Sequence, residues 1–456
     1  MDNTKQLPAN LLSKRVIRLF LSLFLSLNLA LALALPRQAF AYEPVSTEDL
    51  LVEAEDALAW IADTIGVTAG EHLLSSQALM QYCGSSFEDW LALTIGRLGA
   101  SEGAERYLSS LKDYVTRCYQ SDALLDSRNA TEWHRIGLTV LALGGDPTAF
   151  GVDPNGQPIN LVADGTYYRG NTNPLGAQGL NAYIFALLLL DAGDYSVPAD
   201  AVDTRQSIIA SILAAQADDG GFCLSAASSS SVDITAMALQ ALAPYYESWD
   251  SYDFTPLGGG AEQSKPVWEA IDAALSYLSG EQDSQGNFAF AEGEASAETT
   301  CQVIIALCSL GIDPLRDVRF IKEGSSTFDG LMIFQNEDGG FAHQLASEPD
   351  GSAGFLADGS SDLGASREAA SALVTLARYN EGMNTLYDMT PETSSLWTFV
   401  PADSSLLINP ATSQPIDYSA QTATGTSPVV VIGIIGGVVV AAGIAAFVLV
   451  VMRRRR

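Results

Sequence analysis

The stretch QADDGGF at residues 216–222 is one of three segments with the same internal spacing. QDSQGNF at 282–288 and QNEDGGF at 335–341 also place a glycine four residues after a glutamine and a phenylalanine two residues later. The starts of the three segments lie 66 and 53 residues apart, which indicates an internal repeat. The repeated positions are Gln216, Gly220 and Phe222; Gln282, Gly286 and Phe288; and Gln335, Gly339 and Phe341. A glycine at such a point accommodates a turn with positive φ.

Between these turns lie segments with the apolar spacing of helices. Six resemble one another, since each begins with an acidic or amide residue and then becomes apolar nearly all round. They occupy residues 88–99, 131–144, 180–193, 232–243, 297–311 and 366–379. A helix that is apolar on most sides is buried on most sides. We therefore predict six buried inner helices.

More amphipathic segments alternate with the buried ones. They lie at residues 101–118, 205–216, 266–282 and 328–335. Strict alternation of buried and amphipathic helices predicts an all-α barrel, an α/α toroid with six inner and about six outer helices. The three glycine turns are expected where an outer helix ends and the chain returns to the next inner helix.

The QxxxGxF turns, followed by a helix with the pattern x-T-A-x-A-L, resemble the repeats of squalene–hopene cyclases and protein prenyltransferase β-subunits. That resemblance covers roughly residues 85–385 and implies an α/α toroid. The secreted vitamin B12 carriers intrinsic factor and transcobalamin share this barrel. For chemistry the resemblance implies less, because one fold hosts unrelated activities.

The catalytic motifs of these families are incomplete. The cyclases protonate an alkene with the central acid of an Asp-x-Asp-Asp-Thr-Ala stretch. Asp233 matches that acid, but Ser231 and Ile234 stand where the flanking aspartates would be. The prenyltransferases hold zinc with an Asp-x-Cys pair and a later histidine, and the nearest candidates here are Glu298, Cys301 and His343. His343 falls in a turn, so neither a catalytic residue nor a metal or other cofactor is predicted.

The N-terminal ends of the predicted inner helices form the expected barrel mouth. Aromatic and acidic side chains gather there: Trp90, Trp133, Tyr183, Asp233, Glu298 and Glu368. Such a set suits a small, partly apolar ligand with polar edges. The leading hypothesis is a binding module for a corrinoid-like or isoprenoid-like ligand. The alternatives are a cyclase-like or prenyltransferase-like enzyme with an altered motif, and an adhesive surface protein with a protein partner.

The two ends of the chain predict a location. Basic residues, the apolar run LFLSLFLSLNLALALAL and Ala39-Phe40-Ala41 are typical of a secretory signal peptide over residues 1–41. Residues 429–452 carry no charge and are long enough to span a bilayer. The arginines at 453–456 would keep the C-terminus in the cytoplasm. We expect a toroid ectodomain at 42–394 and a Ser/Thr/Pro-rich stalk at 395–428, on a single-pass cell-membrane protein. A degenerate sorting signal before the span is the alternative to a plain anchor.

Charge and cysteine content restrict the partners and the cross-links. Without the first 41 residues and the last four, 14 basic and 53 acidic residues remain, a net charge of −39. Such a surface repels nucleic acid. Five cysteines follow the signal peptide, at 83, 118, 223, 301 and 308, so at least one thiol is unpaired or intermolecular. A helical hairpin over 86–119 would place Cys83 beside Cys118, and we predict a disulfide there.

Overall fold

The computed structural model describes residues 45–100, 102–121, 124–291, 294–346, 359–392 and 394–396. The predicted signal peptide, most of the stalk, the predicted membrane span and the basic tail lie outside these residues. Within the described ranges, no helix is both long enough and apolar enough to cross a bilayer. The described residues all belong to one compact unit.

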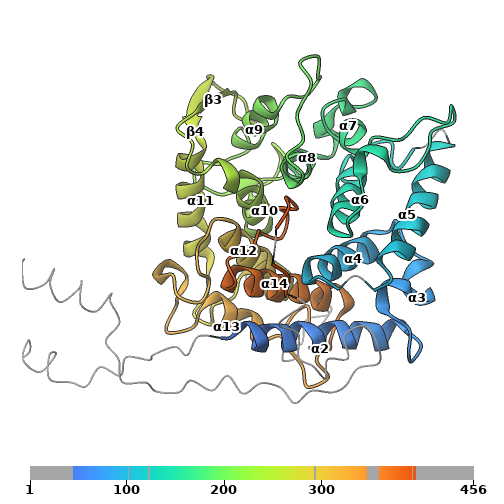
Figure 1. Ribbon diagram of the computed structural model, residues 1–456. Helices are drawn as coiled ribbons and strands as arrows, with labels where there is room; N and C mark the ends of the chain where they lie inside the picture. The colour runs from blue at the N-terminus through green and yellow to red at the C-terminus, as the bar shows by residue number, and fades with distance from the viewer. Residues whose placement is uncertain are drawn as a thin grey trace, which may run out of the picture. The chain divides into compact units, whose positions relative to one another are not determined.

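Six helices in this part of the chain form a closed inner ring (Figure 1). They are α4 (Ser86–Leu98), α6 (Thr131–Ala142), α8 (Leu180–Ala192), α10 (Val232–Leu242), α12 (Ala297–Ser309) and α14 (Leu363–Asn380). Each packs against the next, and α14 returns to pack against α4. These helices coincide with the six buried segments predicted from the sequence. The ring closes because their side chains are apolar toward both neighbours, which leaves few exposed faces.

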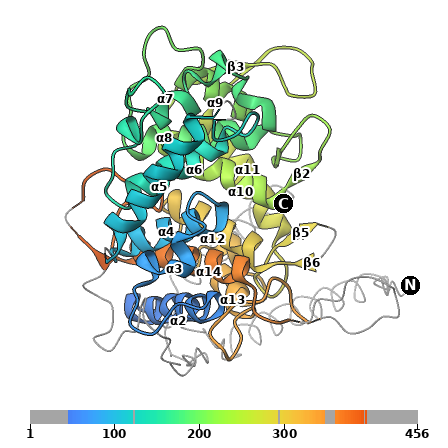
Figure 2. The same cartoon turned by 90° about the vertical axis from the view of Figure 1, so that its right-hand side faces the viewer.

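A second set of helices packs outside this ring. It comprises α2 (Thr47–Ile65), α5 (Ala104–Tyr119), α7 (Leu161–Gly165), α9 (Arg205–Leu213), α11 (Val267–Glu281) and α13 (Thr327–Met332). Helices α7, α9, α11 and α13 pack on α6, α8, α10 and α12, respectively. Helix α2 lies along α14, as Figures 1 and 2 both show. The predicted alternation of inner and outer helices is confirmed in the described residues.

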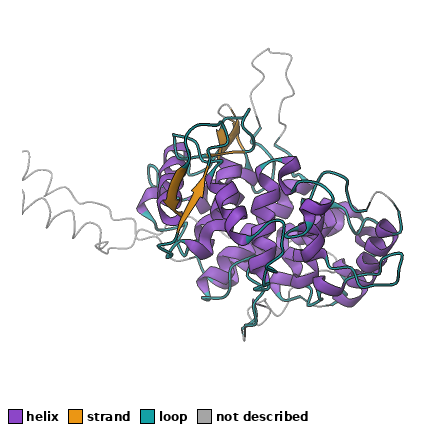
Figure 3. Cartoon of the chain, turned by 90° about the horizontal axis from the view of Figure 1, so that it is seen from above, coloured by secondary structure: helices purple, strands orange, loops and turns teal. Residues whose placement is uncertain are grey.

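Short elements connect these helices. The helical ones are η1 (Leu73–Ser75), α3 (Gln77–Met80), η2 (Pro147–Ala149), η3 (Arg169–Asn171), η4 (Leu175–Gln178), η5 (Ala243–Tyr245) and η6 (Val318–Phe320). The strands form three antiparallel pairs: β1 (Phe222–Cys223) with β2 (Ser230–Ser231), β3 (Ser251–Phe254) with β4 (Gln263–Pro266), and β5 (Ala289–Ala291) with β6 (Glu294–Ala295). The strands gather on one side of the helices in Figure 3.

The glycine turns join three helices at once. Gly220 has φ +92°, and a Cβ there would stand 2.6 Å from the carbonyl oxygen of Ala273 in α11. The Gln216 amide donates to the Gly220 oxygen (2.9 Å) and to the Ala270 oxygen in α11 (2.8 Å). The amide of Phe222 donates to the hydroxyl of Thr235 in α10 (2.8 Å). Positive φ at glycine and the amide-to-hydroxyl bond recur at Gly286 with Phe288 and Thr300, and at Gly339 with Phe341 and Ser366.

The third turn shows how the outer layer closes. Gln335 donates to the carboxylate of Glu53 in α2, where the other two glutamines bond carbonyl oxygens of the chain that follows them. A Cβ on Gly339 would lie 3.1 Å from the carbonyl oxygen of Asp56, also in α2. Helix α2 therefore takes the place of a next outer helix, although it stands first in the chain.

The predicted Cys83–Cys118 disulfide is not formed, and both residues are free thiols. The hairpin of α4 and α5 is present, but Tyr114 lies between its two ends. The Tyr114 ring covers Gly84, next to Cys83, and its hydroxyl shares a hydrogen bond with Cys118. Burial, and to a smaller extent the charge of Asp89, raise the pKa of Cys83 to about 11. Cys83 is therefore a poorly ionised, partly buried thiol.

Candidate functional site

A cavity of about 280 Å³ lies inside the ring, and all six inner helices contribute to its wall. Its apolar side chains are Trp90, Leu93, Phe185, Met237, Ile305 and Tyr387. Its polar side chains include Glu132, Arg135, Asn181, Gln302, Arg367 and Glu368. The cavity therefore offers an aromatic surface together with several hydrogen-bonding groups.

The aromatic part of the wall is a cluster of three rings. The Trp90 and Phe185 ring centroids lie 5.6 Å apart, and those of Trp90 and Tyr387 lie 6.3 Å apart with the planes near perpendicular. Tilted and edge-on pairs at these distances are favourable arrangements for aromatic rings. Trp90 and Phe185 come from inner helices, whereas Tyr387 comes from the segment after α14.

That segment, the strap (residues 383–392), crosses the C-terminal ends of the inner helices. Arg97 at the end of α4 donates to the carbonyl oxygens of Thr385 (2.8 Å) and Asp388 (2.9 Å). Arg378 at the end of α14 binds the carboxylate of Glu392 at 2.5 Å. The amide of Met389 donates to the oxygen of Ala192 at the end of α8 (2.9 Å). These contacts hold the strap in place (Figure 1, orange-red), and Tyr387 on the strap lines the cavity.

The charged groups on the cavity wall are partly paired. Arg135 binds Asp89 at 3.1 Å and Glu132 at 2.8 Å, and the Asp89 carboxylate also accepts from the Tyr107 hydroxyl at 2.7 Å. Arg135 and Asp89 are almost fully buried, so this network holds α4, α5 and α6 together. Glu368 accepts from Arg367 at 2.8 Å and from Gln302 at 2.9 Å.

Two buried polar atoms on this wall have no hydrogen-bond partner within the described chain. They are Oδ1 of Asn181, an acceptor, and Nε of Arg367, a donor. Buried polar atoms are almost always bonded, so an unpaired donor and acceptor in one cavity indicate a place for a polar ligand group or water.

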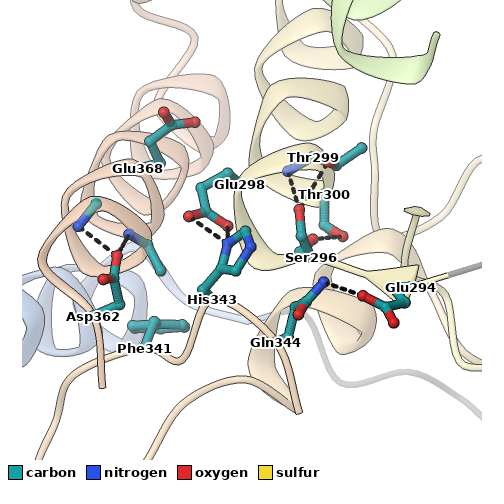
Figure 4. Close-up of polar contacts among 12 residues, drawn as sticks. Glu294, Ser296, Glu298, Thr299, Thr300, Phe341, His343, Gln344, Asp362 and Glu368 are labelled. Atoms are coloured by element: carbon teal, nitrogen blue, oxygen red, sulfur yellow. Dashed lines mark hydrogen bonds and ion pairs between the residues drawn. The ribbon is translucent and has the colours of Figure 1, made fainter. Parts of the chain in front are cut away.

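An acidic cluster lies beside the cavity, at the N-terminal ends of α10, α12 and α14. Figure 4 shows the imidazole of His343 directed at the carboxylate of Glu298, with Glu368 on the neighbouring helix. His343 Nδ1 lies 2.8 Å from Glu298 Oε2. Burial and, less strongly, the charges of Glu368 and Glu298 raise the pKa of Asp233 to about 6, against a hydrogen bond from Thr299. Burial also raises the pKa of Glu298.

The structure separates the six residues predicted at the barrel mouth. Trp90 and Glu368 line the cavity, and Asp233 and Glu298 belong to the adjoining acidic cluster. Trp133 does not line the cavity: it is fully buried, its indole donates to Tyr119 at 2.6 Å, and the Arg169 guanidinium stacks on its ring. Tyr183 does not line it either, because its ring packs against Gly176 in η4. Both departures have one cause: at the first turn of an inner helix, some positions face a neighbouring helix and others face the bore.

Sequence reasoning missed Asn181, Phe185, Gln302, Arg367 and Tyr387. Asn181 and Phe185 are four residues apart on α8, and Met237 follows Asp233 by four on α10. Residues four apart share a helix face, so an extension by one turn from Asp233 and Glu298 would have found Met237 and Gln302. Asn181, Phe185 and Arg367 are not one turn from any predicted mouth residue. No periodic signal marks Tyr387, which belongs to no repeat.

His343 was predicted in a turn away from the inner helices, but its side chain contacts inner helix α12. It reaches Glu298, while Cys301, one turn further along α12, is fully buried with a pKa well above its usual range. No three His, Cys, Asp or Glu side chains in the described ranges are arranged to hold a metal ion.

Comparison with known proteins yields structural likeness alone: no family model and no curated protein matches the chain. An ent-copalyl diphosphate synthase from Streptomyces platensis is 15% identical with a TM-score of 0.36, over 64% of this chain and 50% of that one. The chain thus spans about half the length of that synthase. A type II terpene cyclase from Scytonema, solved with geranylgeranyl dihydroxybenzoate, is 12% identical with a TM-score of 0.43, over 73% and 99%.

Candida albicans protein geranylgeranyltransferase-I, solved with GGPP, is 13% identical with a TM-score of 0.43, over 76% of this chain and 97% of that one. These three proteins include terpene cyclases and a protein prenyltransferase, the families that the repeats resemble. At such scores the likeness carries no argument about activity. The assignment of an α/α toroid rests on the contacts that close this chain's own ring of inner helices around the cavity.

Proposed function

We propose that this chain is a binding module that holds a small, partly apolar molecule in the central cavity of its toroid. The observation that carries the proposal is that one cavity contains both an aromatic wall and two buried polar atoms without a hydrogen-bond partner, Asn181 Oδ1 and Arg367 Nε. Binding pockets combine an apolar surface with placed polar groups, and here an aromatic surface faces a wall that is largely polar. The ring of helices holds these groups in place before any ligand arrives, which lowers the entropy lost on binding.

The cavity volume restricts the size of the ligand. Pockets for drug-sized molecules measure about 300–1,000 Å³, and this cavity of about 280 Å³ lies at the lower limit. A corrinoid is bulkier than a drug-sized molecule. Of the two ligand classes predicted from the sequence, the isoprenoid-like one therefore fits better. A hydroxyl on such a ligand can donate to Asn181 Oδ1 or accept from Arg367 Nε, whereas a carbonyl can accept from Arg367 alone.

The first test is native mass spectrometry of the protein purified gently from its own cells. The expected result is a discrete added mass that denaturation releases. Trp90→Ala should lose that mass, because it removes the central ring of the aromatic cluster. Trp249→Ala is the matched control, since the Trp249 side chain is 83% exposed and does not line the cavity. Bare protein in all three samples would contradict the proposal.

Titration with farnesol, followed by tryptophan fluorescence, tests the ligand class directly. Loss of a central aromatic anchor costs about 1–2 kcal/mol or more, so Trp90→Ala should weaken binding at least about tenfold. Trp249→Ala should bind like the unaltered protein. Equal binding by all three proteins would place the farnesol outside the central cavity.

An enzyme is the second candidate, and the acidic cluster is the observation that favours it. A carboxyl with a pKa near 6 is suited to donate or accept a proton near neutral pH, and Asp233 has such a pKa with an unpaired buried oxygen. An enzyme acting on an isoprenoid would lose turnover in Asp233→Asn while retaining substrate. A binding module would keep the same ligand affinity and show no turnover in either form.

We also propose that the toroid is displayed outside the cell and held by the apolar segment at 429–452. The support is its sequence: 24 uncharged residues are followed by four arginines, and residues 1–41 have the pattern typical of a signal peptide. Protease added to intact cells should then degrade the toroid. A chain ending at residue 428 should be released into the medium.

An adhesive protein, the third candidate, would keep binding its partner surface after Trp90→Ala.

A further inference from the structure

A second cavity, of about 530 Å³, lies at the opposite end of the ring. Its wall comes from the C-terminal ends of α8, α10 and α12 and from the strap. Tyr387 lines this cavity and the central one, so its side chain stands between them. Leu188, Ala241 and Pro244 give the second cavity an apolar part.

The helix ends around this cavity lack the cations found elsewhere in the ring. Helices α4 and α14 carry Arg97 and Arg378 in their last turns, and both arginines bond carbonyl oxygens there. Helices α8, α10 and α12 have no basic residue in their last turns. The C-terminal end of a helix carries a partial negative charge, and the ends of α10 and α12 have no basic residue of their own to neutralise it.

One cation does line the second cavity, but it is already paired. Arg205 binds Asp191 at 2.7 Å and donates to the carbonyl oxygens of Leu190 (3.0 Å) and Tyr195 (2.9 Å). Two further carboxylates, Asp194 and Asp388, line the same cavity. Neither has a basic side chain within ion-pair distance among the described residues. The cavity therefore carries an excess of negative charge.

A buried acceptor on this wall is also unsatisfied. Gln240 is 3% exposed, and its amide nitrogen donates to the backbone oxygen of Gln302 (3.1 Å) and to that residue's side chain (3.0 Å). Its Oε1 has no hydrogen-bond partner in the described chain. An unpaired buried acceptor beside excess carboxylates calls for a donor that carries positive charge.

We propose that this second cavity binds an organic ammonium ion, with the charged nitrogen between Asp194, Asp388 and Gln240 and an apolar body against Leu188, Pro244 and Tyr387. The site is separate from the central cavity, and it does not depend on what the central cavity binds.

Calorimetric titration of the full-length protein with three matched probes tests this proposal. The probes are 4-phenylbutylammonium, 4-phenylbutanol and 4-phenylbutyrate, which share an apolar body and differ in charge. We expect saturable binding of the ammonium, at least tenfold weaker binding of the alcohol and no binding of the carboxylate. Added salt should weaken ammonium binding. Equal binding of the alcohol and the ammonium, or no binding of either, would overturn the proposal.

Two isosteric variants locate the charged nitrogen. Asp388→Asn keeps an oxygen for the bonds that Asp388 accepts from Thr390, and Asp194→Asn introduces a residue type that tolerates the φ of +50° found there. Each should weaken ammonium binding about fivefold with an unchanged melting temperature. Glu368→Gln, which removes a carboxylate from the central cavity, is the matched control and should have no effect. The proposal fails if Glu368→Gln weakens binding while both second-cavity variants leave it unchanged.

Discussion

Charged residues at the two ends of α4 differ in sign, and each charge matches the helix end on which it stands. Acidic residues stand in the first turns of α4, α6, α10 and α12, where the helix dipole is positive. Arg97 and Arg378 stand in the last turns of α4 and α14, where it is negative. The arginines are bonded on several sides, whereas carboxylates at the other end crowd one another. The α4 and α14 side of the C-terminal end is thus held by bonded arginines, whereas the N-terminal end retains crowded carboxylates.

The arginine end should give the largest loss of stability. Arg378 is 3% exposed, and it binds Glu392 and the backbone oxygens of Asn384 and Arg97. Arg378→Ala would leave the partly buried Glu392 carboxylate without its cation, and removal of one partner from a buried pair costs about 3–5 kcal/mol. Denaturant unfolding of the full-length protein measures this loss in the free energy of unfolding. Arg319→Ala, which breaks the more exposed pair with Asp317, should cost less than about 1 kcal/mol.

A smaller loss is expected from the turns that lead into the inner helices. Gly286 has φ +92°, and a Cβ there would lie 2.0 Å from the carbonyl oxygen of Ser326. Gly286→Ala should cost about 2–3 kcal/mol, because the turn must take a strained conformation or move away from α13. Gly280→Ala is the matched control within α11, where a Cβ meets nothing within 4 Å. It should raise stability by about 0.5 kcal/mol in the same unfolding assay. Equal effects of the two substitutions would contradict the role assigned to the repeat turn.

The acidic end should show the reverse of the arginine end, since removal of a charge there stabilises the fold. The pKa of Asp233 is raised to about 6 in the folded protein and is near 3.9 in an unfolded chain. The folded state therefore binds the proton more tightly, and stability falls as pH rises from about 4 to above 6. Asp233→Asn should be more stable than the unaltered protein by about 1–3 kcal/mol at pH 7 and equally stable below about pH 4. A difference that does not change with pH would show that this carboxyl titrates normally.

The inner helices and the repeat turns show what a single sequence can predict. The six inner helices were predictable because each must be apolar toward two neighbours and a bore, and no surface segment has that pattern. The repeat turns were predictable because Gly220, Gly286 and Gly339 recur at one spacing with the same glutamine and phenylalanine. Helix α2 closes the outer layer through Glu53 and Asp56, yet no repeat turn precedes it.

The site was less predictable because it depends on rotation about each helix axis and on a segment outside the repeats. Trp90 and Trp133 occupy similar places near the starts of inner helices, but one faces the bore and the other faces Tyr119 and Arg169. Tyr387 reaches the cavity through strap contacts made by residues nearly 300 positions earlier in the chain, such as Arg97. The predicted disulfide failed in the same way, since the side chain of Tyr114 decides the approach of Cys83 and Cys118.

The smallest expected effect concerns His343, whose side chain is 54% exposed where it binds Glu298. An exposed ion pair contributes about 0–1 kcal/mol, so His343→Ala should change the free energy of unfolding by less than that. Its effect on charge should be clearer: the hydrogen bond and charge of His343 lower the pKa of Glu298, and their loss should let burial raise that pKa further. Carbon-13 NMR titration of the Glu298 carboxyl measures the shift. His343→Gln, which retains a hydrogen-bond donor without the charge, should give an intermediate value. If the Glu298 pKa is the same in all three proteins, the histidine does not moderate the acidic end, and the crowding of carboxylates there is balanced by Arg367 and Gln302 alone.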